Sequence, residues 1–369
     1  MVASYGLDEL RKNHDIELDG LAAKIEDRDP ELVGLQFPDG IRDYGPAIAD
    51  AIEEQTGIDC VISGDPSFGA CDLALQLEHI GVDLLVHFGH SPMPSIDGID
   101  AFDVIFVPTY SKAPVEPVVR KAAQHLEGKT VGLLTTAQHA QRLDDVCEAL
   151  EDEGVDPLVG YGDNRVINPG QLLGCNFTAA RTIAEQSDAF LYIGSGDFHP
   201  IAAAWGLKEL PLYVADPMTS EVRQVNDRIE ELMKQRHAAI ANAKEADEIG
   251  ILVGTRVGQQ RVKYAKGLVT LCERKGFEAH LIAMDYFSPE ALKSFRHMGA
   301  FVNTACPRIT TDDYARYDAP MITPQELEIV VGKRSWEDYI FDEFKGTKPA
   351  PHEHEDAVEL EHDVVGEDP

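Results

Sequence analysis

The stretch LVGLQF at residues 32–37 is the first of three short apolar runs that decide the fold of this chain. The other two runs are KTVGLLT at residues 129–135 and IGILVG at residues 249–254. Each has the length and composition of a buried strand. Helical periodicity follows these runs in residues 44–52, 117–123 and 220–243. Strands that alternate with helices predict an α/β protein with parallel sheets.

The spacing of the three runs predicts three α/β domains, because the steps between them have the length of ordinary domains. The first domain is expected at residues 1–128 and begins with a terminal helix within residues 1–29. The second is expected at residues 129–245 and the third at residues 246–345. Residues 346–369 carry Pro, Glu and His with few large apolar side chains, which predicts a disordered acidic tail.

The composition is strongly acidic throughout the chain. It contains 65 Asp and Glu against 32 Lys and Arg, a formal charge of −33. Such a charge disfavours binding to nucleic acid and to anionic membranes, which require cationic side chains. It is typical of proteins from a cytosol of high salt, as in a halophile. No apolar run reaches the roughly 18 residues of a membrane helix, and no signal peptide opens the chain, so we expect a cytoplasmic protein.

Six cysteines occur in 369 residues, and no two of them form a CxxC pair. Scattered cysteines usually act as small hydrophobic side chains. Cys60, Cys147 and Cys272 fit that interpretation, since each lies in a strand-like or helical apolar pattern. They are expected to be structural.

Cys71, Cys175 and Cys306 lie in a different context, because small, polar or turn-forming residues flank each of them. One falls in each predicted domain. Three thiolates could hold an iron–sulfur cluster, and a fourth iron would then remain open to a small molecule. The three cysteines are therefore the candidate metal ligands.

A repeat connects two of these cysteines to the predicted fold. Cys71 precedes the run DLLVHFGH at residues 83–90, and Cys175 precedes DAFLYIG at residues 188–194. In both cases a helix-length segment leads from the thiol to a buried strand that ends in glycine, which indicates duplicated units. Cys306 instead follows its strand directly. Strand ends in α/β domains face the ligand crevice, so three domains packed around one axis would bring the thiols together.

Five motifs resemble those of the archaeal diphthamide biosynthesis enzymes, the 2-(3-amino-3-carboxypropyl)histidine synthases. They are QFPDG at 36–40, GACD at 69–72, GSGDFHP at 194–200, GTRVGQQR at 254–261 and ACPR at 305–308. The resemblance covers residues 31–330. It implies three related Rossmann-like domains around a pseudo-threefold axis, each of which gives one cysteine to a 4Fe-4S cluster. It also implies that S-adenosylmethionine binds the open iron.

The resemblance further implies a radical transfer reaction. The 3-amino-3-carboxypropyl group of S-adenosylmethionine is moved to a histidine carbon of translation elongation factor 2, with methylthioadenosine as the by-product. Family members act as homodimers and need an electron donor. Like them, this chain lacks the CxxxCxxC run of ordinary radical enzymes that use S-adenosylmethionine.

The resemblance also suggests residues for the cosubstrate. Gln260 and Arg308 are expected to bind its α-carboxylate, which a guanidinium can grip with two parallel hydrogen bonds. Lys263 follows Gln260 by one helical turn and could add charge. His199 is a candidate proton donor or adenosine contact, and His90 shares that interpretation. Either histidine could equally be structural.

Two other functions remain open from the sequence. A quinolinate synthase-like hydro-lyase also has three domains, three cysteines and an open iron, but it uses the iron as a Lewis acid. A non-catalytic partner subunit could use the cysteines only to hold a cluster or zinc. The histidines of the tail, His352, His354 and His362, could bind a divalent metal, although a disordered tail explains them as well.

Overall fold

A computed structural model describes residues 5–94, 103–207, 210–346 and 348 of the chain. The predicted tail at 346–369 falls outside these residues almost entirely, as do the three histidines within it. None of the helices in the described ranges has both the length and the apolar character that crossing a membrane requires.

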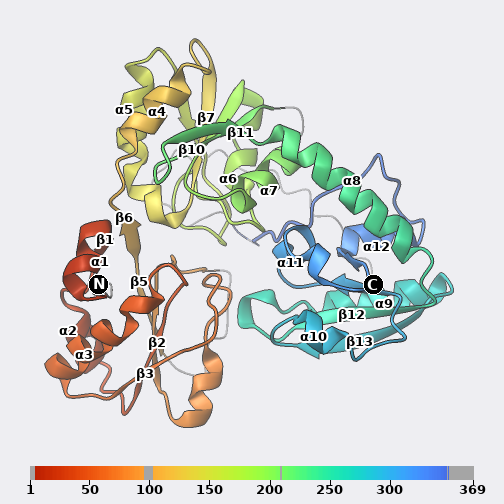
Figure 1. Ribbon diagram of the computed structural model, residues 1–369, viewed down its shortest axis with the longest axis horizontal. Coiled ribbons are helices and arrows are strands. Elements are labelled where there is room, and N and C mark those ends of the chain that lie inside the picture. The colour runs from red at the N-terminus through yellow and green to blue at the C-terminus, as the bar shows by residue number, and fades with distance from the viewer. Residues whose placement is uncertain (1–4, 95–102, 208–209, 347, 349–369) are drawn as a thin grey trace.

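Three larger β-sheets form the framework, and Figure 1 shows them in three separate lobes. The first sheet has the order β3 (Cys60–Ile62), β2 (Val33–Gln36), β4 (Leu84–Phe88), β5 (Asp103–Val107). The second has the order β8 (Asp156–Val159), β7 (Thr130–Thr135), β9 (Ala189–Ile193), β10 (Leu212–Asp216), β11 (Glu221–Gln224). The third has the order β13 (Glu278–Met284), β12 (Glu248–Gly254), β14 (Ala300–Asn303), β15 (Met321–Ile322). A small antiparallel pair joins β1 (His14–Ile16) to β6 (Thr109–Ser111).

Helices connect and cover these strands, as Figure 1 shows. The α-helices are α1 (Leu7–Asn13), α2 (Leu21–Glu26), α3 (Gly45–Thr56), α4 (Glu116–Ala123), α5 (Leu143–Glu151), α6 (Thr178–Arg181), α7 (Phe198–Leu207), α8 (Asn226–Ala243), α9 (Val262–Arg274), α10 (Pro289–Leu292), α11 (Arg308–Thr311) and α12 (Pro324–Val330). Short 3₁₀ turns are η1 (Arg42–Tyr44), η2 (Leu75–Ile80), η3 (Ala137–Arg142), η4 (Ala184–Gln186), η5 (Val257–Gln259) and η6 (Tyr314–Arg316).

The three sheets share one strand order. In each sheet the strand that comes first in the chain lies between the second and the third, and the fourth follows the third. All pairings in this common part are parallel, and only β11 is added antiparallel. The order is that of flavodoxin-like sheets, in which ligands bind where the strand order reverses. The predicted mixed α/β fold with parallel sheets is therefore confirmed.

Two segments differ from the local sequence pattern. The helix expected within residues 1–29 is interrupted, because His14–Ile16 pairs with β6 and Gly20 adopts a left-handed conformation with φ 81°. The helix expected at residues 220–243 begins only at Asn226. The preceding residues form β11, since pairing with β10 satisfies their backbone groups. In both places a long-range pairing overrides helical propensity.

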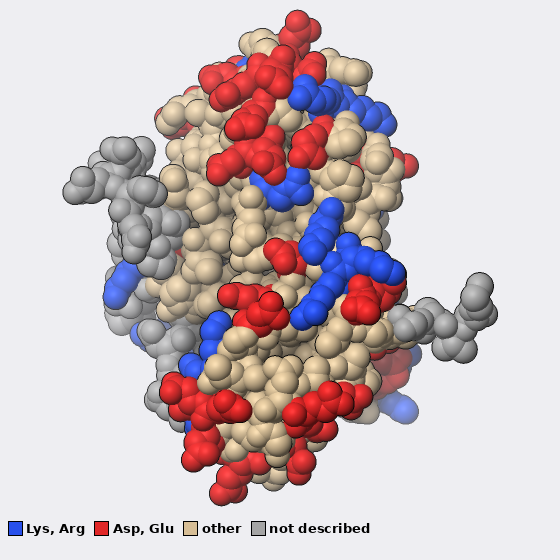
Figure 2. Space-filling view, turned by 90° about the vertical axis from the view of Figure 1, so that its left-hand side faces the viewer, with Lys and Arg blue, Asp and Glu red and all other residues tan. Residues whose placement is uncertain are grey.

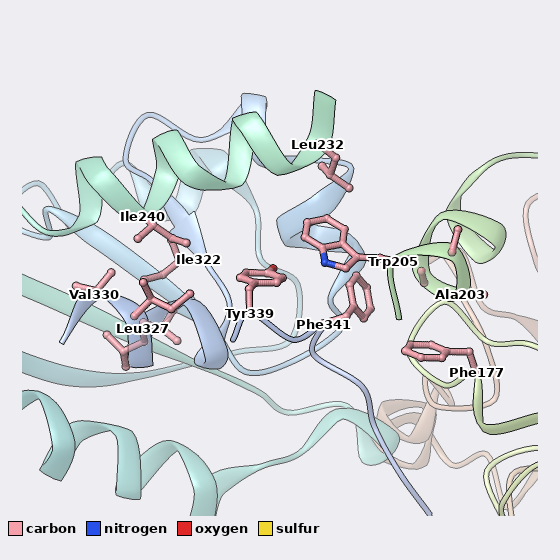
Figure 3. Packing of buried hydrophobic residues seen from close by; sticks show 14 of the residues in the cluster. Phe177, Ala203, Trp205, Leu232, Ile240, Ile322, Leu327, Val330, Tyr339 and Phe341 are labelled. Carbon is pink, nitrogen blue, oxygen red and sulfur yellow. The ribbon is translucent and has the colours of Figure 1, made fainter. Parts of the chain in front are cut away.

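A continuous hydrophobic cluster links the second and third lobes. Figure 3 shows Trp205 and Phe177 of the second lobe close to Phe341 and Tyr339, with Leu232 and Ile240 on the same side of α8. Trp205 stacks on Tyr339 with ring centroids 5.1 Å apart. The two lobes therefore share one core rather than meeting at a polar interface.

Helix α8 is also fixed to the third lobe by a buried ion pair. Arg236 and Glu326 are both fully buried, and their side chains form two hydrogen bonds of 2.7 and 2.6 Å. The guanidinium also donates to the backbone oxygens of Thr310 and Met321. Glu326 in turn completes the capping box of α12 with Thr323. The pair thus connects α8, α11, β15 and α12.

Acidic side chains are prominent on the surface. On the face that Figure 2 shows, Asp and Glu cover both ends, and Lys and Arg gather nearer the middle. The two basic residues of α1, Arg11 and Lys12, each pair with a nearby carboxylate. Exposed pairs of this kind contribute little to stability, so the surface charge bears mainly on solubility and salt response.

Candidate functional site

The loops that follow the first and third strands of all three sheets meet at one cavity of about 510 Å³. The first sheet contributes Asp39, Gly89 and His90; the second Thr136, Gln138 and Ser195; the third Arg256, Gln259, Ala305 and Cys306. These loops lie where the strand order of each sheet reverses. Three ligand crevices of the flavodoxin type therefore open into a single cavity.

Cys71, Cys175 and Cys306 all line this cavity, and all three are free thiols. Cys60, Cys147 and Cys272 do not line it; Cys272 is completely buried in the core shared by the second and third lobes. The structure thus brings together the three cysteines that the sequence singled out. It also separates them from the three expected to be structural.

The loop of Cys71 is held by the third lobe. The backbone N–H of Gly258 donates to the Cys71 carbonyl at 3.0 Å, and the Gln259 side chain donates to its Sγ at 3.5 Å. Arg256 forms an ion pair with Asp72, and both side chains are almost fully buried. The segment GTRVGQQR therefore holds the Cys71 loop in place, although Gln259 and Cys71 are 188 residues apart in the sequence.

The loop of Cys175 is held by residues 342–346, which we call the strap. The N–H of Phe344 donates to the Cys175 carbonyl at 2.7 Å, and Asn176 donates to the carbonyl of Phe344 at 2.8 Å. The N–H of Gly346 donates to Asp163 at 2.6 Å, and Asp163 also accepts from Asn176. The strap thus closes a network around the second cysteine.

The strap also reaches the third cysteine. Asp342, at its start, accepts two hydrogen bonds from Arg261, at 3.0 and 2.6 Å. The same guanidinium donates to the backbone oxygen of Thr304 at 2.8 Å. Within the loop itself, Asn303 donates to the Cys306 carbonyl at 2.8 Å. All three cysteine loops are therefore held by backbone and side-chain hydrogen bonds before any ligand is considered.

Burial keeps the three thiols protonated in the free protein. It raises the pKa of Cys71 to about 11, raises that of Cys175, and raises that of Cys306 well above the ordinary value. The charges of the other two thiolates raise the pKa of Cys306 further. Three thiolates can therefore coexist only with a compensating positive charge, and metal binding must release their protons.

Arg165 supplies part of such a charge, and the sequence analysis missed it. It lines the cavity and lowers the pKa of Cys175 by its charge and a hydrogen bond, against the larger effect of burial. Its Nε and Nη2 atoms are buried without a hydrogen-bond partner in the part of the chain that the structure describes. A buried guanidinium with unused donors fits an anionic ligand. No local signal marks Arg165, which lies ten residues before Cys175 in a loop.

The side chains predicted to bind the cosubstrate occupy different places. Arg308 lines the cavity, pairs with Asp312 at 3.1 Å, and lies over the Phe198 ring at 5.2 Å. Gln260 is exposed and donates to the Thr255 carbonyl at 2.6 Å, and Lys263 is exposed on α9. Neither belongs to the lining residues. The glutamine that does line the cavity is Gln259.

His199 and His90 both line the cavity. Burial lowers the pKa of each to about 4, so both rings are neutral near pH 7. The charges of Arg308 and His90 lower the pKa of His199 further. His199 also lines a second cavity of about 530 Å³, whose wall shares Ser195, Phe198 and Arg308 with the first.

No group of three or more His, Cys, Asp or Glu side chains within the described ranges is close enough to bind one metal ion. A structural zinc site would require such a group, because Zn–S bonds are only about 2.3 Å long. In a multinuclear cluster each cysteine binds a different iron, so the thiolates stand further apart. Cys71, Cys175 and Cys306 come from three different loops around one cavity, as the ligands of such a cluster can.

Comparison with known proteins agrees with the fold. Residues 37–340 match the family model of diphthamide synthesis proteins. A 2-(3-amino-3-carboxypropyl)histidine synthase of Pyrococcus horikoshii is 34% identical over 336 residues, which cover 90% of this chain and 94% of that protein. Subunit 1 of the synthase of Caenorhabditis elegans is 28% identical over 323 residues, or 87% of this chain and 81% of that protein.

A solved structure is similar over nearly the whole chain. The crystal structure of Dph2 from Pyrococcus horikoshii with a 4Fe-4S cluster matches with a TM-score of 0.81 and 32% identity, covering 93% of this chain and 96% of that one. Three flavodoxin-like sheets around a cavity lined by three cysteines define the class of this α/β protein. The chain belongs to the diphthamide synthesis family.

Proposed function

We propose that this chain is a 2-(3-amino-3-carboxypropyl)histidine synthase. It transfers the 3-amino-3-carboxypropyl group of S-adenosylmethionine to a histidine of translation elongation factor 2, the first step of diphthamide biosynthesis. The observation that carries the proposal is that three thiols from loops of three different sheets line one cavity. The near-complete coverage of the Pyrococcus synthase supports the same activity.

Cys71, Cys175 and Cys306 would hold a 4Fe-4S cluster with one open iron. The donor set fits, since the thiols are free, line one cavity and adjoin Arg165, whose Nε and Nη2 atoms are buried. When bound, such a cluster supplies the electron that breaks the Cγ–S bond of the sulfonium. The role of the protein is to hold the thiols in place, bind the cosubstrate and keep water from the reacting carbon.

For the cosubstrate, Arg308 is the proposed clamp of the α-carboxylate, with Gln260 and Lys263 as further proposed contacts. Arg308 has direct access to the cavity. Gln260 and Lys263 would have to turn toward it from the exposed start of α9. Gln259 already faces the cavity and is therefore an additional candidate. His199 remains the proposed proton donor or adenosine contact.

The carboxylate clamp can be tested with Arg308→Lys. The substitution keeps the positive charge but loses the planar fork, so the affinity for S-adenosylmethionine is expected to fall about tenfold. Equilibrium binding to the cluster-loaded protein measures the effect, and the cluster spectrum should stay the same. Arg296→Lys, on the exposed surface, is the matched control. Unchanged affinity in Arg308→Lys would assign the clamp to another residue.

The chain as a whole is organised as three related Rossmann-like domains at residues 1–128, 129–245 and 246–345, around a pseudo-threefold axis. The common strand order and the convergence of three switch points on one cavity support this arrangement. Helix α8 lies at the end of the second range and bridges to the third through Arg236 and Glu326.

Two partners complete the proposed reaction besides elongation factor 2. An electron donor must reduce the enzyme, and the resemblance to the archaeal family supports a homodimer. Because one chain provides all three cysteines, each subunit of that dimer holds a whole site.

One assay tests the proposed function. Anaerobically reconstituted protein, reduced with dithionite at high salt, is incubated with elongation factor 2 and with S-adenosylmethionine labelled in the aminocarboxypropyl portion. We expect release of methylthioadenosine and label on the factor, with little 5′-deoxyadenosine. High salt is required because a chain of charge −33 is destabilised by self-repulsion in dilute buffer.

Other outcomes of this assay support other functions. Dominant 5′-deoxyadenosine would indicate an ordinary radical enzyme. Formation of quinolinate from dihydroxyacetone phosphate and iminoaspartate, with S-adenosylmethionine untouched, would indicate the hydro-lyase. Absence of any turnover by a fully loaded cluster at high salt would indicate a non-catalytic subunit.

A further inference from the structure

A chain of polar side chains runs from the interior of the first sheet to the cavity. Gln36 on β2 and His87 on β4 are register partners in adjacent parallel strands. Gln36 Oε1 lies 2.8 Å from His87 Nδ1, and His87 Nε2 lies 3.0 Å from His90 Nδ1. Gln36 and His87 are buried, and His90 lines the cavity. This series of hydrogen-bonded side chains therefore ends at His90, at the cavity where the reaction would take place.

Backbone groups that contact Gln36 fix the direction of the hydrogen bonds from Gln36 through His87 to His90. The N–H of Ala74 can only donate, and it donates to Gln36 Oε1 at 3.1 Å. The Gln36 amide nitrogen donates to the Asp72 carbonyl at 2.7 Å. A flipped amide would put donor against donor and acceptor against acceptor, so this orientation is the only one that satisfies both contacts.

The tautomers of both histidines follow from that orientation. His87 Nδ1 faces an acceptor and must carry the hydrogen. Burial lowers the pKa of His87 well below its ordinary value, so the ring is neutral and its Nε2 is an acceptor. His90 must then donate from Nδ1. Its other nitrogen, Nε2, is left with a lone pair.

The proposed reaction releases one proton. The Cγ–S bond of a sulfonium cation breaks, a C–C bond forms at the imidazole carbon of the substrate, and the C–H bond of that carbon breaks. Methylthioadenosine is neutral, so the positive charge of the sulfonium leaves as H⁺. The electron that breaks the Cγ–S bond is recovered when the carbon loses its proton, and the transfer is redox-neutral overall. A base in the cavity must accept that proton.

We propose that His90 Nε2, with its tautomer set by Gln36 and His87, accepts the proton released from the substrate imidazole. The inference rests on the proposed function and assigns one step within it. On accepting the proton, His90 can pass its Nδ1 hydrogen to His87 Nε2, so that two rings share the charge. His87 and Gln36 are positioning residues. A weak base is sufficient, because loss of the proton restores the aromatic substrate ring.

The tautomer can be measured without any activity. Long-range proton–nitrogen NMR spectra of the histidine rings, recorded on the full-length cluster-free protein at neutral pH, distinguish protonated from unprotonated ring nitrogens. We expect Nδ1–H with unprotonated Nε2 for both His87 and His90. Spectra of His87→Phe and His90→Gln assign the signals. An unprotonated Nδ1 in His90 of the native protein would overturn the proposal.

Two variants test the chemical role. In His90→Gln we expect methylthioadenosine to be released at a rate similar to that of the native protein. Label on elongation factor 2 should fall about 100-fold, which is the lower end of the rate loss that follows removal of a general base. In His87→Phe, His90 loses its acceptor and should shift to the Nε2–H form, with the same uncoupling. His79→Gln, an exposed histidine of the same lobe, is the control.

The outcomes separate this inference from the proposed function. Coupled transfer in both variants would remove His90 from the reaction and leave the synthase activity standing. No transfer by the native protein would instead contradict the synthase activity itself. Circular dichroism and cluster content of each variant identify any variant that has not folded, and the NMR result on the native protein does not depend on the variants.

Discussion

Replacement of Cys71, Cys175 or Cys306 by alanine is expected to leave anaerobically reconstituted protein without a stable iron–sulfur cluster. Each thiol is one of the three proposed cluster ligands, so its loss would open a second iron and destabilise the whole cluster. The native protein should hold about four irons and four sulfides per chain. Iron and sulfide analysis with the absorption spectrum measures the change.

The remaining cysteines provide the matched controls. Cys147→Ala and Cys272→Ala should keep a normal cluster and lose only packing, about 1 kcal/mol or somewhat more for the fully buried Cys272. Normal iron loading in all three ligand variants, or zinc in place of iron in the native protein, would rule out the proposed cluster site.

Replacement of Arg236 by methionine is expected to lower the free energy of unfolding by about 3–5 kcal/mol. The substitution leaves Glu326 fully buried without its cation, although Tyr339 still donates to it at 3.0 Å. It also removes donors from the carbonyls of Thr310 and Met321. Urea unfolding at fixed high salt measures the loss.

A surface pair gives the comparison for this effect. Arg120 binds Asp152 and Glu153 with all three side chains substantially exposed, so Arg120→Met should change stability by less than about 1 kcal/mol. Equal losses in the two variants would mean that Arg236 contributes through its aliphatic stem alone. Recovery of stability in the double variant Arg236→Met, Glu326→Leu would confirm that the unpaired buried carboxylate causes the loss.

The strands and the three cysteines that line the cavity were predictable because local pattern marks them. The apolar runs at 32–37, 129–135 and 249–254 form β2, β7 and β12, each of which has a neighbouring strand on both sides. A buried strand in a parallel sheet is apolar on both faces, so it is recognisable without its neighbours. The cysteines differed from the others through their small and turn-forming flanks.

Features that depend on distant partners were not predictable. Residues 221–224 form β11 rather than the start of α8, because β10 offers an edge for pairing. Arg165 and the strap carry no local motif, and their importance arises from contacts with Cys175. The neighbours Gln259 and Gln260 also could not be told apart from the sequence, although only Gln259 lines the cavity. Gln259 is the last residue of the turn η5, and the conformation of this turn places its side chain at the cavity.

The strap gives the candidate site an order of assembly. The side chain of Asn176 donates a hydrogen bond to the carbonyl of Phe344, which is 168 residues later in the sequence. At ribosomal rates of about 5–20 residues per second, that separation corresponds to roughly 8–30 seconds of synthesis. During this interval the Cys175 loop has its bond to Asp163 but lacks the hydrogen bonds that the strap provides. The hydrogen bonds that join the Cys175 loop to residues 342–346 can therefore form only after the strap has been synthesised.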